Sequence, residues 1–213
     1  SVPGRSRTAE IFRAHNQEPE YRSPLTEVGV DVSVGDYVLA IDGRELVAGD
    51  NPYRLLQHLE GAVKVMDDLG LASRVRVSSA HRTPERTLEL VREAEADGCS
   101  VIICAAGMAA HLAGAVAAHS IRPVLGVPLP GGVLDGVDAL LSTVQMPGGI
   151  PVATFAVGKA GAKNAAFFAA QVVSGRRPEV AEALAAARRS GAEAVVDADA
   201  VIQAGLTRGG SVR

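Results

Sequence analysis

The sequence predicts an α/β fold in three α/β/α layers, with a parallel sheet covered by helices on both faces and a partial β-rich segment before it. From residue 58 onward, short apolar runs alternate with amphipathic helical patterns, which is typical of a parallel sheet. Hydrophobic residues make up 47% of the 213 residues but aromatic residues only 3%, so small aliphatic side chains must fill the core. Before residue 58 the chain is polar and rich in turns, with stretches of period-2 apolar spacing, which favours β-structure.

The first 57 residues contain two expected strands and a helix start. Residues 8–15 fit a strand, and residues 36–41 fit a clearer one that ends at the hairpin-turn pair Asp42-Gly43. Asn51-Pro52 then fits a helix start, with asparagine as the cap and proline at the first helical position.

After residue 58 the elements follow from apolar spacing, caps and glycine stops. Residues 59–69 place apolar side chains on one helical face and stop at Gly70. Thr83-Pro84 predicts a helix start, with threonine as the cap, and this helix runs to residue 96. The other expected strands lie at residues 73–78, 100–105, 123–127 and 152–157, and the other helices at 109–119, 134–142, 161–174 and 178–189.

The chain therefore divides into a partial β-rich segment at residues 1–57, an α/β domain at 58–190 and a low-complexity tail at 191–213, which we expect to fray. The formal net charge of −3 points neither to nucleic acid nor to an anionic membrane surface. Apolar runs are too short for a membrane span, and the first residues lack a secretory pattern. Two cysteines, Cys99 and Cys104, favour a reducing compartment and hence the cytoplasm.

Ligands of parallel sheets gather at the carboxyl ends of the strands, and three loops are expected to leave strand ends there. These loops comprise residues 79–82, 106–110 and 128–132. Because the carboxyl ends of parallel strands share one edge of the sheet, polar side chains in these loops are the first candidates for a site.

The first loop contains Ser79, Ala80, His81 and Arg82. Histidine can act as a general acid or base near neutral pH, and a guanidinium offers a forked donor for phosphate or carboxylate. The serine adds a hydroxyl, and the helix that starts at Pro84 directs its positive end into the same space. The alternative is that the histidine and arginine only cap and solvate a loop.

The second loop contains Gly107, which allows a ligand to approach the backbone closely, and leads to His111 in the first turn of a helix. In an alanine-rich helix, a histidine can equally be a packing residue. The spacing of the histidines does not fit a zinc motif, and Cys104 lies inside an apolar strand as a core residue. Residues 158–164 are rich in glycine but fit a strand-to-helix turn better than a phosphate loop, and residues 144–151 predict a rigid loop.

Five motifs, in order, resemble N5-carboxyaminoimidazole ribonucleotide mutase, the bacterial type of phosphoribosylaminoimidazole carboxylase. The resemblance covers residues 62–174, and the segment from Ala109 to Leu112 resembles the mutase class more than the animal carboxylase class. The motifs lie at residues 79–84, 106–114, 123–128, 142–154 and 158–166.

This resemblance implies an enzyme of purine biosynthesis that moves a carboxyl group from the exocyclic nitrogen to C4 of an aminoimidazole nucleotide. It implies a homo-octamer, no metal and no organic cofactor, and a small-molecule nucleotide as the partner. His81 would transfer the proton, in a closed pocket where carbon dioxide is released and recaptured. Ser79, Ala80 and Arg82 would contact the nucleotide, while Gly107, Ala109, His111 and Leu112 would line the pocket around the imidazole and its carboxylate.

The chain departs from this family at its first strand, which normally ends in Gly-Ser-x-Ser-Asp and holds the phosphoribosyl group. Residues 51–55 occupy that place, and the motif occurs nowhere in the chain. Residues 5–56 instead resemble part of the PDZ domain of tricorn-type proteases, through residues 22–30, 35–46 and 50–56. Three hypotheses follow: an active mutase whose strand at residues 36–41 replaces the first one, a catalytically impaired mutase-like protein, or a module that binds peptides by strand addition.

Overall fold

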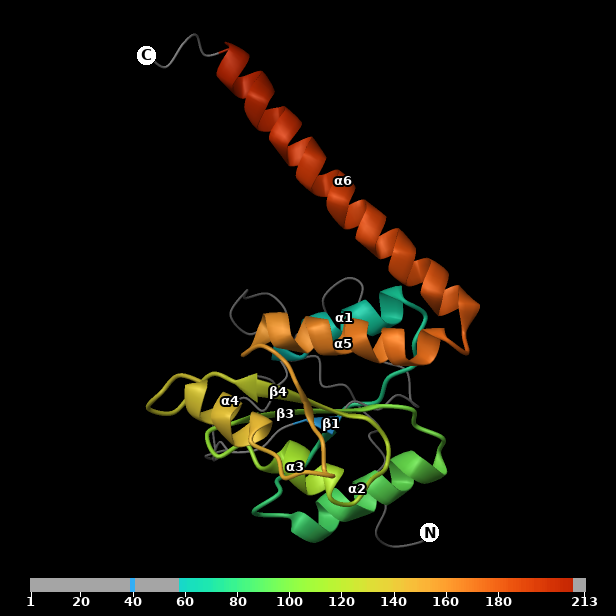
Figure 1. Cartoon of the computed structure of the whole chain (residues 1–213), viewed down its shortest axis with the longest axis vertical. Helices are drawn as coiled ribbons and strands as arrows, with labels where there is room; N and C mark the ends of the chain where they lie inside the picture. The colour runs from blue at the N-terminus through green and yellow to red at the C-terminus, as the bar shows by residue number, and fades with distance from the viewer. Residues whose placement is uncertain (1–38, 41–57, 209–213) are drawn as a thin grey trace, which may run out of the picture.

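The computed structural model describes residues 39–40 and 58–208, which form a parallel sheet between two layers of helices (Figure 1). One group of strands has the order β3-β4-β5, and a second group pairs β1 with β2. All pairs are parallel, which confirms the predicted fold class for the described part. The strands are β1 (Leu39–Ala40), β2 (Arg76–Val77), β3 (Ile102–Gly107), β4 (Val124–Leu129) and β5 (Ala153–Thr154).

Strand β1 contributes two residues of the strand that we predicted at residues 36–41. Leu39 pairs with Arg76 and Ala40 with Val77 in parallel register, and β1 also lies beside β3. A segment from before residue 58 thus joins the sheet. The other elements expected in residues 1–57, which are the strand at 8–15 and the helix start at Asn51, lie outside the described residues.

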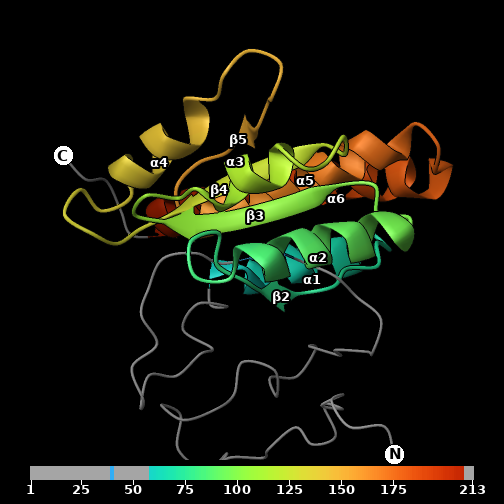
Figure 2. The ribbon, with the colours of Figure 1, turned by 90° about the horizontal axis from the view of Figure 1, so that it is seen from below.

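Successive residues of β3 point to opposite faces of the sheet, as the twofold period of a strand requires. Ile103 and Ala105 face helices α1 (Glu60–Asp68) and α5 (Lys159–Ser174). Ile102 and Cys104 face the other layer, which contains α2 (Pro84–Ala96), α3 (Leu112–Ala117) and α4 (Val137–Val144). Figure 2 shows α2 and α3 along β3. Both faces are therefore buried, which explains the continuous apolar runs in the sequence.

Helices α1 and α5 pack side by side through small residues (Figure 1). The inner face of α5 is almost entirely alanine, with Ala162, Ala165 and Ala166 fully buried. Short side chains let the two helix axes approach closely. The small residues that replace aromatic ones in this chain therefore fill this contact.

The helices agree with the prediction in number and order over residues 58–174, but several are shorter than expected. Helix α3 starts at Leu112, not at residue 109, because Met108 and Ala110 have φ angles of 57° and 45°, which no α-helix contains. Strands β2 and β5 have two residues each. No helix in the described ranges is long and apolar enough to cross a membrane.

The predicted end of the last helix, at residue 189, is wrong, and the expected fraying at the end of the chain falls largely on residues 209–213, which lie outside the described residues. Helix α6 (Pro178–Arg208) continues for 31 residues and projects away from the layers (Figure 1). Its first turns are anchored because Val180 and Leu184 pack against Leu69 and Ala170. The sequence after residue 190 is rich in alanine, so one glycine at position 191, which costs about 1 kcal/mol in a helix, does not end it.

Candidate active site

The first two predicted loops meet at the carboxyl end of the sheet. The loop after β2 carries His81 and the loop after β3 carries His111, thirty positions later in the chain. Nε2 of His81 and Nδ1 of His111 lie 2.6 Å apart within a hydrogen bond, and the rings meet edge to face with centroids 4.7 Å apart. The contact requires one nitrogen to donate and the other to accept, so the tautomer of one ring depends on that of the other.

The His81 loop is held by hydrogen bonds between Ser79 and Thr83. The Thr83 hydroxyl donates to the Ser79 carbonyl oxygen over 3.1 Å and accepts from the Ser79 N–H over 3.0 Å. The Thr83 N–H also donates to the Ser79 carbonyl oxygen, over 2.9 Å, and the Arg82 N–H donates to the Ser79 hydroxyl oxygen over 3.2 Å. Thr83 is the N-cap residue of α2, as predicted, but its hydroxyl bonds back into the loop and makes no side-chain cap hydrogen bond to the helix.

The His111 loop is shaped by left-handed backbone at two residues other than glycine. Met108 and Ala110 have positive φ angles, a region that side chains with a Cβ seldom adopt. The Ala110 N–H donates to the Gly107 carbonyl oxygen over 3.0 Å, which closes a tight turn. His111 follows at the cap position of α3 and not, as the sequence predicts, in the first helical turn.

The third loop, after β4, touches the second. A Cβ built on Gly132 would lie 3.5 Å from Cγ of Met108 and 2.9 Å from Oδ2 of Asp138. The Pro128 carbonyl oxygen accepts from the N–H of Gly158 over 2.8 Å, so the turn into α5 is fixed to the same edge. Residues 158–164 form this turn and the start of α5, as the sequence favoured over a phosphate loop.

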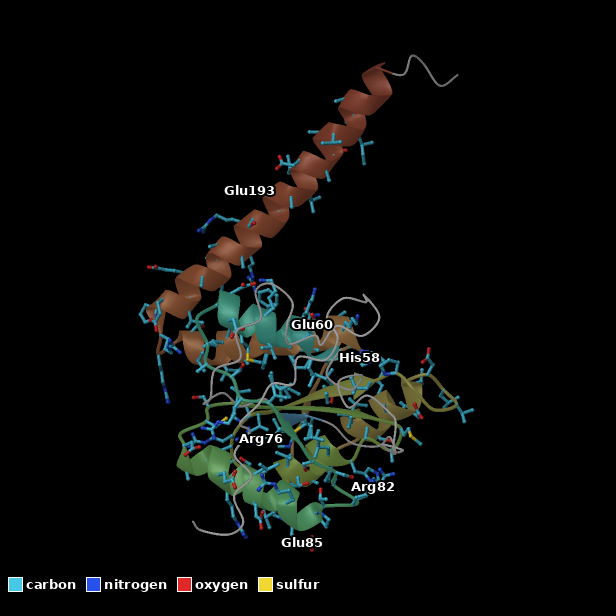
Figure 3. The ribbon with its side chains drawn as sticks, turned by 180° about the vertical axis from the view of Figure 1, so that it is seen from behind. His58, Glu60, Arg76, Arg82, Glu85 and Glu193 are labelled. Carbon is cyan, nitrogen blue, oxygen red and sulfur yellow. The ribbon has the colours of Figure 1, made fainter. Side chains whose placement is uncertain are left out.

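The predicted site residues differ in how far they face solvent. His81, Arg82, Ala109 and His111 are exposed, whereas Ser79, Ala80 and Gly107 are half-buried. The Leu112 side chain is buried in the core between the sheet and the α2–α3 layer, and Ala80 packs against the same core. These two residues therefore offer mainly backbone to a ligand. Figure 3 shows Arg82 and Glu85 together at the start of α2.

Sequence analysis did not single out His58, which lies at the start of α1 (Figure 3). Burial, followed by the positive charge of Lys159, lowers the pKa of His58. Its Nδ1 is buried without a hydrogen-bond partner in the described part of the chain. In the sequence, His58 stands just before the expected helix at residues 59–69, and Lys159 stands just before the one at 161–174. Both helices belong to the same layer.

Two other groups bear on the chemistry of the site. Burial raises the pKa of Cys104 to about 12, so its thiol stays protonated at neutral pH, in keeping with the predicted core role. Within residues 58–208, no group of three or more His, Cys, Asp or Glu side chains is placed to hold a metal ion.

Comparison with known families gives two matches that overlap. The AIR carboxylase family matches residues 55–194, and the tricorn protease PDZ domain matches residues 4–79. In the overlap, the described elements α1 and β2 form part of the α/β layers.

Curated relatives share close to half of their aligned residues with this chain. The N5-carboxyaminoimidazole ribonucleotide mutase of Pseudomonas aeruginosa is 49% identical over 139 residues, which are 65% of this chain and 85% of that protein. The enzyme of the same name from Escherichia coli is 45% identical over 139 residues, 65% of this chain and 82% of that protein. Among solved structures, Treponema denticola PurE superposes with a TM-score of 0.64 at 27% identity, covering 77% of this chain and 96% of that one.

Proposed function

The chain belongs to the AIR carboxylase family, and from this premise we propose that it is a mutase of purine biosynthesis. It interconverts N5-carboxyaminoimidazole ribonucleotide and 4-carboxy-5-aminoimidazole ribonucleotide. The curated relatives from Pseudomonas aeruginosa and Escherichia coli carry the name of this activity. The pair formed by His81 and His111 is the observation in this chain that supports the proposal.

The reaction requires two proton transfers, one to the exocyclic nitrogen and one from C4. When the bond between the carboxyl carbon and the exocyclic nitrogen breaks, carbon dioxide leaves and the nitrogen takes up a proton. When C4 of the imidazole attacks carbon dioxide, a carbon–carbon bond forms and C4 loses its proton. One acid–base group can give the first proton and take the second, and it is then back in its starting protonation state. No oxidant or added nucleophile is needed.

We assign this proton transfer to His81. Its hydrogen bond to His111 supports the assignment, because it fixes one ring nitrogen and thereby the orientation of the imidazole. A ring held in this way is placed for transfer before substrate arrives, which is how enzymes save the cost of orientation. His111 acts on the tautomer of His81 and lines the imidazole subsite together with Gly107, Ala109 and Leu112.

The nucleotide would lie against the first loop, in contact with Ser79, Ala80 and Arg82. The Arg82 guanidinium is exposed at the start of α2, where the positive end of a helix of 13 residues also favours negative charge. Phosphate and carboxylate are the groups for which a guanidinium is the suited partner. Family membership implies neither a metal nor an organic cofactor for this reaction.

A homo-octamer in the cytoplasm is part of the same proposal. The reaction needs a closed pocket to retain carbon dioxide, yet His81 and Arg82 are exposed in the single chain, so neighbouring copies are suited to cover them. Helix α6 carries exposed apolar side chains that are available for contacts between copies, with Val195 71% and Val201 72% exposed. Native mass spectrometry of the whole chain tests this: eight copies are expected, and a stable monomer contradicts it.

The test of the activity is a mutase assay with His81→Asn. Wild type is expected to turn over, and His81→Asn to lose roughly 10²- to 10⁴-fold in kcat, the usual contribution of a general acid–base group. His119→Asn is the matched control, because His119 is exposed in the turn that follows α3 and its ring nitrogen bonds to the nearby Ala115 carbonyl oxygen.

The alternative is a catalytically impaired member of the family, since the Gly-Ser-x-Ser-Asp motif is absent. It predicts that wild type and His81→Asn are equally inactive while the chain remains folded. Titration with the nucleotide, followed by calorimetry, separates the two cases further, because a chain without a phosphate site binds weakly or not at all.

A further inference from the structure

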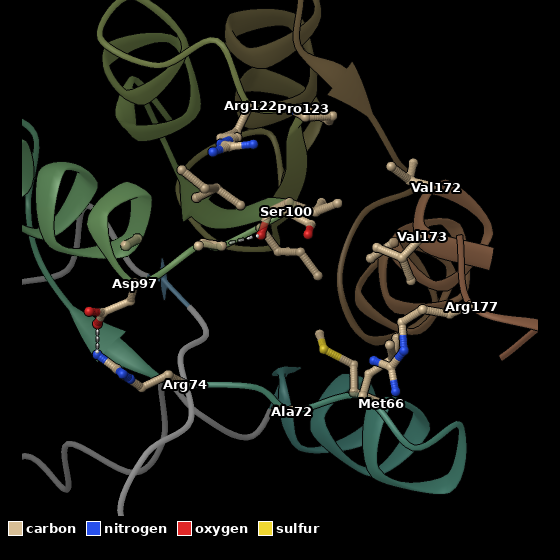
Figure 4. A pocket seen from close by; sticks show the side chains of 18 of the residues that line it. Met66, Ala72, Arg74, Asp97, Ser100, Arg122, Pro123, Val172, Val173 and Arg177 are labelled. Atoms are coloured by element: carbon tan, nitrogen blue, oxygen red, sulfur yellow. Dashed lines mark hydrogen bonds and ion pairs between the residues drawn. The ribbon is translucent and has the colours of Figure 1, made fainter. Parts of the chain in front are cut away.

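A cavity of about 730 Å³ opens at the amino end of the sheet, opposite the histidine pair (Figure 4). It lies where β3 begins and where α1, α2 and α5 end. Residues from both helix layers line it, Met66 and Val173 from one and Ala94 from the other, so it lies between the two layers. Its volume is in the range of small-molecule sites, about 300–1,000 Å³.

The interior of the cavity is apolar, and its opening is cationic. Met66, Ile102 and Ile103 belong to the inner wall, and all three are buried. Four arginines line the cavity against a single carboxylate, that of Asp97. The arginines are Arg74, Arg122, Arg176 and Arg177.

Two of these arginines already have partners in the described chain. Arg74 forms an ion pair with Asp97 over 2.9 Å, as Figure 4 shows. Arg177 pairs with Glu179 over 2.7 Å and donates to the Gly70 carbonyl oxygen over 3.3 Å, which is what the negative end of a helix attracts. For the side chains of Arg122 and Arg176 there is neither an ion pair nor a hydrogen bond with the described residues, although both line the opening.

We propose that this cavity binds an amphipathic anion, with an apolar body inside and a carboxylate or phosphate group held by the arginines that line the cavity, Arg122 or Arg176. An apolar wall removes hydrocarbon from water, and two guanidiniums supply the forked donors that such groups prefer. The site is separate from the histidine pair and does not depend on the proposed mutase activity.

Cys99 provides a reporter inside this cavity. It lines the wall and is half-buried, and its thiol donates to the Val101 carbonyl oxygen over 3.0 Å. The other cysteine of the chain, Cys104, is buried in the core. Alkylation of the native protein therefore reports on one position, and a ligand in the cavity slows it.

The experiment measures the rate of Cys99 alkylation by N-ethylmaleimide in the whole chain, by mass spectrometry, with dodecanoate, dodecanol or inorganic phosphate added below micelle-forming concentrations. Dodecanoate is expected to slow alkylation several-fold, and the other two to have little effect. In the double variant R122Q/R176Q, the dodecanoate concentration needed for half protection rises about three- to tenfold, as expected for two exposed ion pairs. R188Q/R189Q is the matched control, since these arginines are exposed on α6 away from the cavity.

Several results would overturn the proposal. These are no protection by dodecanoate, equal protection by dodecanol, full protection by phosphate alone, or R122Q/R176Q behaving as wild type. Circular dichroism checks that each variant is folded. If the double variant is not, R122Q alone, at an exposed position, replaces it. The dodecanoate concentration for half protection should then rise by about half as much on a logarithmic scale.

Discussion

At the carboxyl end of the sheet, side chains and strained turns hold three loops together, whereas at the amino end arginines surround an apolar cavity. The first end fixes two histidines within a hydrogen bond of 2.6 Å, with Ser79 and Thr83 tied to each other. The second leaves Arg122 and Arg176 without an ion pair among the described residues. The same sheet thus offers one preorganised end and one open end, and substitutions at the two ends should differ in effect.

The largest difference is expected between two glycines at opposite ends of α5. A Cβ at Gly161 would overlap the Ala156 carbonyl oxygen, whereas one at Gly175 would meet nothing within 4 Å. Gly161→Ala should therefore lower the free energy of unfolding by at least about 3 kcal/mol, because backbone must move. Gly175→Ala should change it by less than about 1 kcal/mol. Urea denaturation measures the free energy of unfolding of both variants. Equal losses would show that the carboxyl end of the sheet is not more rigid than the amino end.

A smaller effect is expected at the histidine that orients His81. His111→Gln removes the ring nitrogen in the pair and should lower kcat about 10- to 100-fold, less than the loss expected for His81→Asn. KM should change little, because the hydrogen bond that is lost orients the His81 ring rather than the substrate. His119→Gln serves as the control, and a loss confined to KM would show that His111 only binds substrate.

The smallest effect is expected for single hydroxyl groups. Ser79→Ala removes the acceptor of the Arg82 N–H and should cost about 1 kcal/mol of stability, the usual net value of a hydrogen bond. Ser100→Ala, at an exposed residue that lines the amino-end cavity, should be nearly neutral. Thermal unfolding measures the stability of both variants. An equal loss of stability at both positions would show that the two ends of the sheet do not differ in this respect.

Much of this arrangement could be predicted from sequence because it depends on periodicity and chain order. Alternating apolar runs and helical faces gave the parallel sheet, and the rule that strand ends share an edge brought His81 and His111 to one place. The segment before residue 58 was expected to supply a strand, and Leu39 and Ala40 do join the sheet.

Other features could not be predicted because tertiary contacts decide them. Nothing in Met108 or Ala110 indicates left-handed backbone, since glycine and asparagine are the residues that usually adopt it. Thr83 has the composition of a helix cap, but the Ser79 backbone competes for its hydroxyl. Low complexity does not indicate where a helix ends: alanine, the strongest helix former, recurs after Gly191, and α6 continues to Arg208.

The central claim is that His81 moves the proton at C4 of the imidazole, and exchange of that proton tests it directly. Aminoimidazole ribonucleotide incubated with the protein and bicarbonate in deuterated water should lose its C4 proton signal in nuclear magnetic resonance faster with wild type than without protein. His81→Asn should reduce the exchange to the rate without protein, and His119→Asn should not. Equal exchange with wild type and His81→Asn would contradict the account.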